Sequence, residues 1–158
     1  MSILKLIWLF CPIVLLSTCA ALTSPQVEIV QGVSWELAQH RQQTLTDLRY
    51  QFDLDIPAEQ FAAIAGTAHI SFRWHEVETN PLVLDFLSPE TRVKTIIANG
   101  QTVEWSSLFD HIVIPAENFK AGQNQIQIEF AAGNEALNRN GDFLYTLFVP
   151  DRAHYSLP

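Results

Sequence analysis

Residues 75–79, His-Glu-Val-Glu-Thr, come closest in this chain to a known chemical motif. They approach the zinc-binding pattern His-Glu-x-x-His, in which two histidines four positions apart share one face of a helix and hold the metal. Thr79 stands where the second histidine is needed, and His75 ends a run of residues that alternates as in a strand. The similarity therefore does not predict a metal site.

The other residues with chemical potential form no catalytic set. The remaining histidines are dispersed along the chain without ligand spacing, and we interpret them as surface or rim residues: His40, His69, His111 and His154. Asp53 and Asp55 are expected on the solvated face of a strand, where nothing apolar would separate their pKa values. The sequence has no G-x-S-x-G turn, no glycine-rich phosphate loop and no cysteine after residue 19.

Composition limits the class of protein. The chain has 158 residues, of which 48% are hydrophobic and 16% charged, enough for one domain-sized core. Its formal net charge of -8 argues against a nucleic-acid partner, which would require clustered lysines and arginines.

Residues 1–21 have the pattern of a signal peptide. A short segment with one lysine precedes an apolar run over residues 6–16, and the small residues 17–21 provide a cleavage context. A membrane span is the rival interpretation, but the run is short and Pro12 interrupts it. We therefore expect an exported protein, either periplasmic or anchored to a membrane and facing outside the cytoplasm.

Cys19 is a possible site of lipidation. Residues 16–19, Leu-Ser-Thr-Cys, resemble a bacterial lipoprotein box, except that Thr18 stands where that pattern has Gly, Ala or Ser. Cleavage after Ala21 is the open alternative. An acyl chain on Cys19 would anchor the protein to a membrane. In both cases the mature chain keeps no disulfide, so its core alone must hold the fold.

The rest of the chain predicts an all-β, antiparallel β-sandwich or saddle-like domain over residues 34–158, after a linker at residues 22–33. Ser34 is a plausible N-cap for one short helix. Residues 48–56 and 66–74 alternate apolar and polar side chains, as strands with one buried face do. Asn99-Gly100 predicts a tight hairpin. Further short strands are expected at residues 81–86, 93–98, 102–105, 111–114 and 125–130.

Residues 143–149 form a nearly continuous apolar run, which predicts a strand buried on both faces. The chain ends soon afterwards at Pro158 without a polar tail. We therefore expect it to be truncated from a larger protein, with the next domain missing.

Four segments together resemble one family. They are GVSWELAQHR (residues 32–41), TLTDLRYQFDLDIP (44–57), GTAHISFRW (66–74) and GDFLYTLFVPDRAHYSLP (141–158). They resemble the N-terminal domain of zinc metallo-aminopeptidases of the aminopeptidase N type, the gluzincins. The resemblance implies a β-saddle that packs against a thermolysin-like catalytic domain and forms one wall of its peptide-binding cleft. The family's zinc ligands lie downstream, so zinc is implied for the full-length parent and none for this fragment, which is expected to be inactive.

The resemblance also suggests residues at the rim of the substrate cleft, namely Tyr145, Leu147 and Val149. In some members the last strand of this domain offers a glutamine and an acidic or amide residue to the substrate's amino group. The matching positions lie near Leu147 and Val149, which are apolar here. No direct substrate contact is therefore carried over. The alternative to a domain of an aminopeptidase is a self-contained β-sandwich that binds a ligand in the periplasm or on the cell surface.

Overall fold

The computed structural model describes residues 26–75, 79–87, 92–132, 138–140 and 142–145. Its helical elements are α1 (Trp35–Thr44) and the short 3-10 helix η2 (Ala116–Asn118). The strands are β1 (Leu45–Asp55), β2 (Ile64–Trp74), β3 (Leu82–Asp85), β4 (Val93–Ala98), β5 (Gln101–Thr102), β6 (Ser106–Leu108), β7 (His111–Ile114), β8 (Gly122–Ala132), β9 (Asn138–Arg139) and β10 (Leu144–Tyr145). Strands predominate, which confirms the predicted all-β class.

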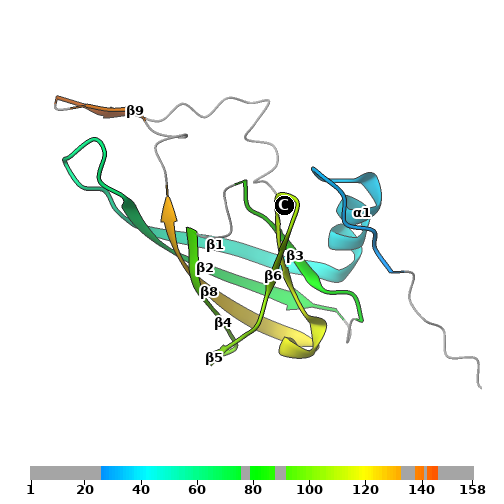
Figure 1. Cartoon of the computed structure of the whole chain (residues 1–158). Coiled ribbons are helices and arrows are strands. Elements are labelled where there is room, and N and C mark those ends of the chain that lie inside the picture. The colour runs from blue at the N-terminus through cyan, green and yellow to red at the C-terminus, as the bar shows by residue number, and fades with distance from the viewer. Residues whose placement is uncertain (1–25, 76–78, 88–91, 133–137, 141, 146–158) are drawn as a thin grey trace, which may run out of the picture.

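The strands form three antiparallel sheets. The largest has five strands in the order β1-β2-β8-β4-β5, and its long members cross the molecule together (Figure 1). A three-stranded sheet, β3-β7-β6, packs over part of one face of the large sheet. A two-stranded sheet, β10-β9, lies near the loop that joins β1 to β2 (Figure 1). The arrangement fits the predicted sandwich-like or saddle-like domain.

The core lies between the five-stranded and three-stranded sheets. The alternation predicted for residues 66–74 is confirmed, because Ala68, Ile70, Phe72 and Trp74 are all buried. They pack in one cluster with apolar residues of the neighbouring strands and of β7: Ile96, Ile126, Ile128, Ile112 and Ile114. Trp74 and Phe119 make an edge-to-face contact with ring centroids 5.1 Å apart, a favoured aromatic geometry.

Local sequence signals explain two connections. Ser34 caps α1, since its hydroxyl accepts a hydrogen bond of 3.0 Å from the backbone N–H of Leu37. Asn99 and Gly100 have φ values of 50° and 85°, so the predicted hairpin between β4 and β5 has positive φ at both central residues.

The described part of the chain contains no helix with the length and apolar character needed to cross a membrane.

Gly66 in β2 allows the Phe130 ring to lie against the sheet. A Cβ at this position would be 2.5 Å from Phe130 Cζ and 3.0 Å from Leu54 Cδ2. We expect Gly66→Val to lower the free energy of unfolding by about 1–3 kcal/mol, because the ring must move away. Urea denaturation measures the effect. In a Phe130→Ala background the same substitution is expected to be neutral or stabilising, and an equal loss in both backgrounds would contradict the close-packing explanation.

Three expectations about burial are wrong. The apolar face of β1 is largely exposed, because the three-stranded sheet covers the other part of the large sheet. Phe143 and Leu144 are exposed, so the described start of the run at residues 143–149 is not buried on both faces. His111 is a buried residue and not a surface or rim residue.

Candidate functional site

The predicted rim residues start at the hairpin formed by β9 and β10. Tyr145 is the last residue of β10, and its backbone pairs with Asn138 of β9. Leu147, Val149 and the possible lipidation site Cys19 lie outside the described residues. The assignment of Tyr145, Leu147 and Val149 to a cleft rim therefore stays a prediction, although the structure shows which part of the domain leads into this segment.

Arg139 attaches this hairpin to the main sheet. Its side chain is only 6% exposed and reaches the loop between β1 and β2. One guanidinium nitrogen donates to the carbonyl oxygen of Pro57 at 2.7 Å, and the other donates to those of Gln60 and Ala62 at 2.7 and 2.8 Å. The planar guanidinium suits this role because its N–H groups project in a fixed fork. These three hydrogen bonds connect the hairpin to one end of the large sheet.

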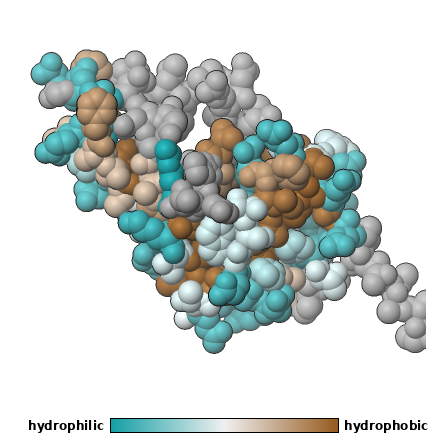
Figure 2. Space-filling view, viewed as in Figure 1, coloured by the Kyte–Doolittle hydropathy of each residue, from teal (hydrophilic) through white to brown (hydrophobic). Residues whose placement is uncertain are grey.

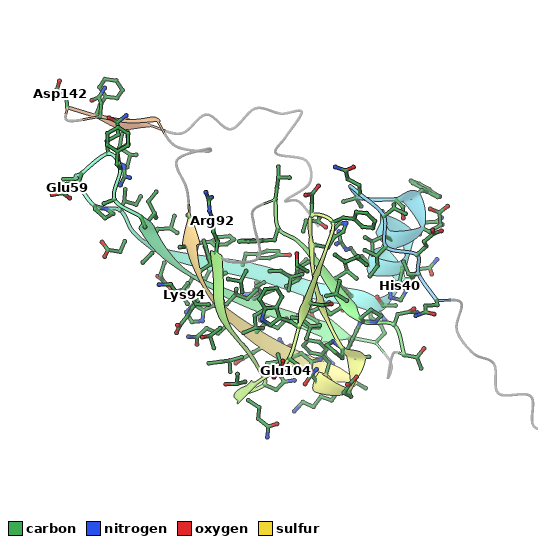
Figure 3. All side chains as sticks on the ribbon, in the orientation of Figure 1. His40, Glu59, Arg92, Lys94, Glu104 and Asp142 are labelled. Carbon is green, nitrogen blue, oxygen red and sulfur yellow. The ribbon has the colours of Figure 1, made fainter. Side chains whose placement is uncertain are left out.

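Large apolar side chains are exposed at this same end. Phe61 of the β1–β2 loop is 91% exposed, and Phe143 and Leu144 of the hairpin are 53% and 47% exposed. We call these three residues the tip patch. Apolar side chains are visible among polar ones at this end in Figure 2, and Glu59 and Asp142 mark it in Figure 3. A group of exposed large apolar residues is typical of a surface that another molecule or domain covers.

A second apolar surface runs along β1. Tyr50, Phe52 and Leu54 are 46%, 58% and 47% exposed, and we call them the β1 stripe. They pair with Ile70, Ala68 and Gly66 of β2, which face the core. Since directly opposite residues of paired strands share a face, the stripe continues the core face of the sheet beyond the part that the three-stranded sheet covers.

A shallow recess of about 550 Å³ opens at the end of the β1 stripe. Phe52, Leu54 and Phe130 supply its apolar lining, and Lys94 also lines it. Its carboxylates are Asp53, Asp55 and Glu129. Asp53 and Asp55 are exposed, as predicted for a solvated face. The recess therefore has the character of an open surface and not of an enclosed catalytic pocket.

Arg41, Asp85 and His111 form a polar cluster that their positions in the sequence do not predict. The two Arg41 guanidinium nitrogens donate to the Asp85 carboxylate at 2.7 and 3.1 Å, in a bidentate pair. His111 Nδ1 is 3.0 Å from Asp85 Oδ1, while its Nε2 is 2.9 Å from the carbonyl oxygen of Gly32 and 3.1 Å from that of Val30. His111 is 2% exposed.

This cluster holds elements together and is not arranged for catalysis. A histidine beside a carboxylate can act as a general base only if its other ring nitrogen can reach a substrate. In His111 that nitrogen faces two backbone carbonyls. The cluster instead connects the segment at residues 30–32 with α1, β3 and β7. Arg41 extends it with a hydrogen bond of 2.8 Å to the carbonyl oxygen of Val83.

Tyr50 lies close enough to this cluster for the charges of Arg41 and Asp85 to affect the pKa of its phenol. Partial burial raises the pKa of the Tyr50 phenol, although almost half of the residue is exposed; Arg41 opposes the rise and Asp85 adds to it. Since the ordinary pKa is near 10, the phenol is neutral at neutral pH. The β1 stripe therefore presents an uncharged surface.

The described residues do not fit a zinc site. Within the described ranges, no three His, Cys, Asp or Glu side chains come together in a way that could hold a metal ion. His75 is exposed, while residues 76–78 of the motif-like segment lie outside the described part. No catalytic step through zinc follows from these residues.

Comparison with known proteins gives matches among solved structures. No family model matches the chain, and no curated protein does. The crystal structure of an M1 zinc metallopeptidase from Deinococcus radiodurans is 20% identical over 57% of this chain and 21% of that chain, with a TM-score of 0.45. A mutant of that enzyme bound to a Tyr-Ser-Ala substrate is 22% identical over 61% of this chain and 22% of that chain, with a TM-score of 0.47.

The chain spans about a fifth of the length of these solved structures. They are zinc metallopeptidases, the class of protein that the sequence resemblance indicates.

Proposed function

We propose that this chain is the non-catalytic N-terminal β-domain of an exported zinc aminopeptidase, in which it packs against a separate catalytic domain and forms one wall of the peptide cleft. The resemblance of the four sequence segments to that family supports the proposal. The domain then has a structural role. It holds one wall of the cleft and the end of a strand in place, while the zinc chemistry occurs in the catalytic domain. Peptide is the substrate class of the whole enzyme.

The observation that carries the proposal is the tip patch and its attachment. Phe61, Phe143 and Leu144 are exposed on a hairpin and a loop that Arg139 joins firmly. The residues proposed for the cleft rim begin at this hairpin with Tyr145. An apolar end, connected by hydrogen bonds to the main sheet and next to the proposed rim, suits a domain that docks on a neighbour and lines a cleft with it. Burial of one such side chain contributes roughly 1.5–3 kcal/mol.

The chain alone is expected to have no peptidase activity. Purified protein should release no amino acid from aminoacyl-p-nitroanilides or short peptides, and its zinc content by mass spectrometry should be far below one equivalent. The physical reason is that the described residues include no group of His, Cys, Asp or Glu side chains that could hold a zinc ion. One equivalent of tightly bound zinc, or hydrolysis that survives repurification, would contradict the proposal.

The decisive test of the proposal begins with the coding DNA beyond codon 158. A reading frame that continues into a Gly-Ala-Met-Glu-Asn segment and His-Glu-x-x-His supports it. A stop codon there, in a gene that is expressed, would overturn it in favour of a self-contained binding module.

The tip patch is then tested in the whole protein. Phe61→Ser should leave the stability of the isolated chain nearly unchanged, because the side chain is exposed there. In the whole protein the same substitution should lower stability, because docking buries the ring. Phe109→Ser is a matched control, since Phe109 is exposed on the turn between β6 and β7. Equal effects of Phe61→Ser in both proteins would mean that no domain covers the patch.

A further inference from the structure

β1 is an edge strand of the large sheet. It is the first strand in the order of that sheet, and within the described part of the chain it pairs with β2 alone (Figure 1). On its other side, the backbone N–H and C=O groups pair with no strand among the described residues, and such an edge can accept another strand. This edge is a different feature from the tip patch on which the proposed function depends.

The regular part of β1 has defined limits. Pairing with β2 is continuous from Arg49 to Asp55, and an irregularity between Thr46 and Arg49 interrupts it on one side. Asp47 has a φ of 53° within that irregularity. Pro57 follows the strand on the other side and lacks a backbone N–H. The seven residues from Arg49 to Asp55 are thus the part that can pair with a new strand, and Phe52 is their midpoint.

The side chains of this segment are complementary to the same segment in reverse. When two copies pair antiparallel around Phe52, Arg49 lies opposite Asp55 of the second copy, and the two-fold symmetry makes this contact twice. Arg49 and Asp55 are exposed, and no ion pair to either is found among the described residues. Cross-strand pairs of opposite charge stabilise a sheet.

The other face of the same pairing is apolar. Tyr50 would lie opposite Leu54 of the second copy, and Phe52 opposite its own equivalent. These three residues form the β1 stripe, whose side chains are exposed in the single chain. Polar Gln51 and Asp53 would meet on the outer face with the charged pairs. Apolar residues therefore meet apolar residues, and polar residues meet polar residues, throughout the segment.

Neighbouring registers are less favourable. Pairing around Gln51 would keep an attractive contact between Arg49 and Asp53, but it would pair only residues 49–53 and leave Leu54 and Asp55 opposite the irregular part of the other strand. Pairing around Asp53 would place that carboxylate opposite its own equivalent. Like charges directly opposite each other destabilise a strand pair. Registers shifted by one residue between the strands would put apolar side chains on the polar face.

We propose that two copies of this chain associate through antiparallel pairing of their β1 edges, with a two-fold axis at Phe52. The two large sheets then become one continuous sheet. A two-fold axis closes the assembly, because each copy uses its single β1 edge once. The net charge of -8 on each copy opposes association at long range. The Arg49–Asp55 contacts favour this register over its neighbours because they place opposite charges directly opposite each other.

The test is disulfide cross-linking in the full chain after Cys11→Ser and Cys19→Ser. Phe52→Cys should give a disulfide-linked dimer under mild oxidation, because the two residues face each other at a Cα separation of about 4.5–5.5 Å. Leu54→Cys is the matched control on the same strand and face. The two cysteines introduced at position 54 of the pair would lie about 13 Å apart along the strand, because Leu54 is opposite Tyr50 of the second copy. Cross-linking through Leu54→Cys should therefore be slower than through Phe52→Cys by about tenfold or more.

Charge exchange tests the register independently. In the Phe52→Cys background, either Arg49→Asp or Asp55→Arg should slow cross-linking by about tenfold, because each places like charges opposite each other twice. The double variant with both changes should restore the rate. Circular dichroism checks that each variant is folded. Equal cross-linking of Phe52→Cys and Leu54→Cys, or a double variant no faster than the single ones, would overturn the proposal whether or not the domain belongs to an aminopeptidase.

Discussion

Asp85→Ala is expected to lower the free energy of unfolding by about 2–4 kcal/mol. The Asp85 carboxylate accepts from both guanidinium nitrogens of Arg41 and lies 3.0 Å from Nδ1 of buried His111. Without it, the imidazole loses its partner at one nitrogen in a site where water has little access. The loss of a buried polar group's partner costs more than the net contribution of an ordinary hydrogen bond. Urea denaturation followed by tryptophan fluorescence measures the change.

Two variants separate this cause from a general effect of charge. Glu104→Ala removes a carboxylate that is exposed, so it should change stability by less than about 0.5 kcal/mol. Asp85→Asn keeps an acceptor oxygen but loses the charge, and it should give an intermediate result. If Asp85→Ala were as mild as Glu104→Ala, the cluster of Arg41, Asp85 and His111 would contribute little to holding residues 30–32, α1, β3 and β7 together.

The elements that sequence predicted well are those governed by local chemistry. Ser34 caps α1 because its side chain reaches an N–H three residues away, and Asn99-Gly100 forms the hairpin because both residues tolerate positive φ. The alternation in residues 66–74 identified the buried face of β2 because the side chains of a strand alternate regardless of its neighbours. These signals need no knowledge of distant contacts.

Features that depend on distant parts of the chain were not predictable. The alternation in β1 predicts which side chains share a face of the sheet, but it carries no information about what covers that face. The β1 stripe is in fact exposed. His111 was interpreted as a surface or rim histidine because its partner Asp85 is 26 residues away, and only the register between β3 and β7 brings them together. Among the predicted rim residues, the structure places Tyr145 at the end of β10, while Leu147 and Val149 lie outside the described part.

Arg139→Met should release the β9–β10 hairpin from the β1–β2 loop. The Arg139 guanidinium donates to three backbone carbonyls of that loop, at 2.7–2.8 Å. Methionine keeps much of the apolar stem but no donor, so these carbonyls lose their charged partner. A hydrogen bond to a charged group contributes roughly 1.5–3 kcal/mol, and bonds made by one side chain do not add independently, so we expect a local loss of about 2–3 kcal/mol. Amide hydrogen exchange should therefore quicken in the loop and hairpin, with little change in β2 and β8.

Arg139→Lys distinguishes geometry from charge in this contact. Lysine keeps the positive charge but not the planar fork that serves carbonyls on both sides, so it should protect the loop only in part. Lys120→Met is the control, because Lys120 is exposed and its loss should leave exchange in the loop and hairpin unchanged. Unchanged exchange in Arg139→Met would mean that other contacts hold the hairpin. The tip patch would then not depend on Arg139 for its position, and the support that this contact gives to a docking role for Phe61, Phe143 and Leu144 would be lost.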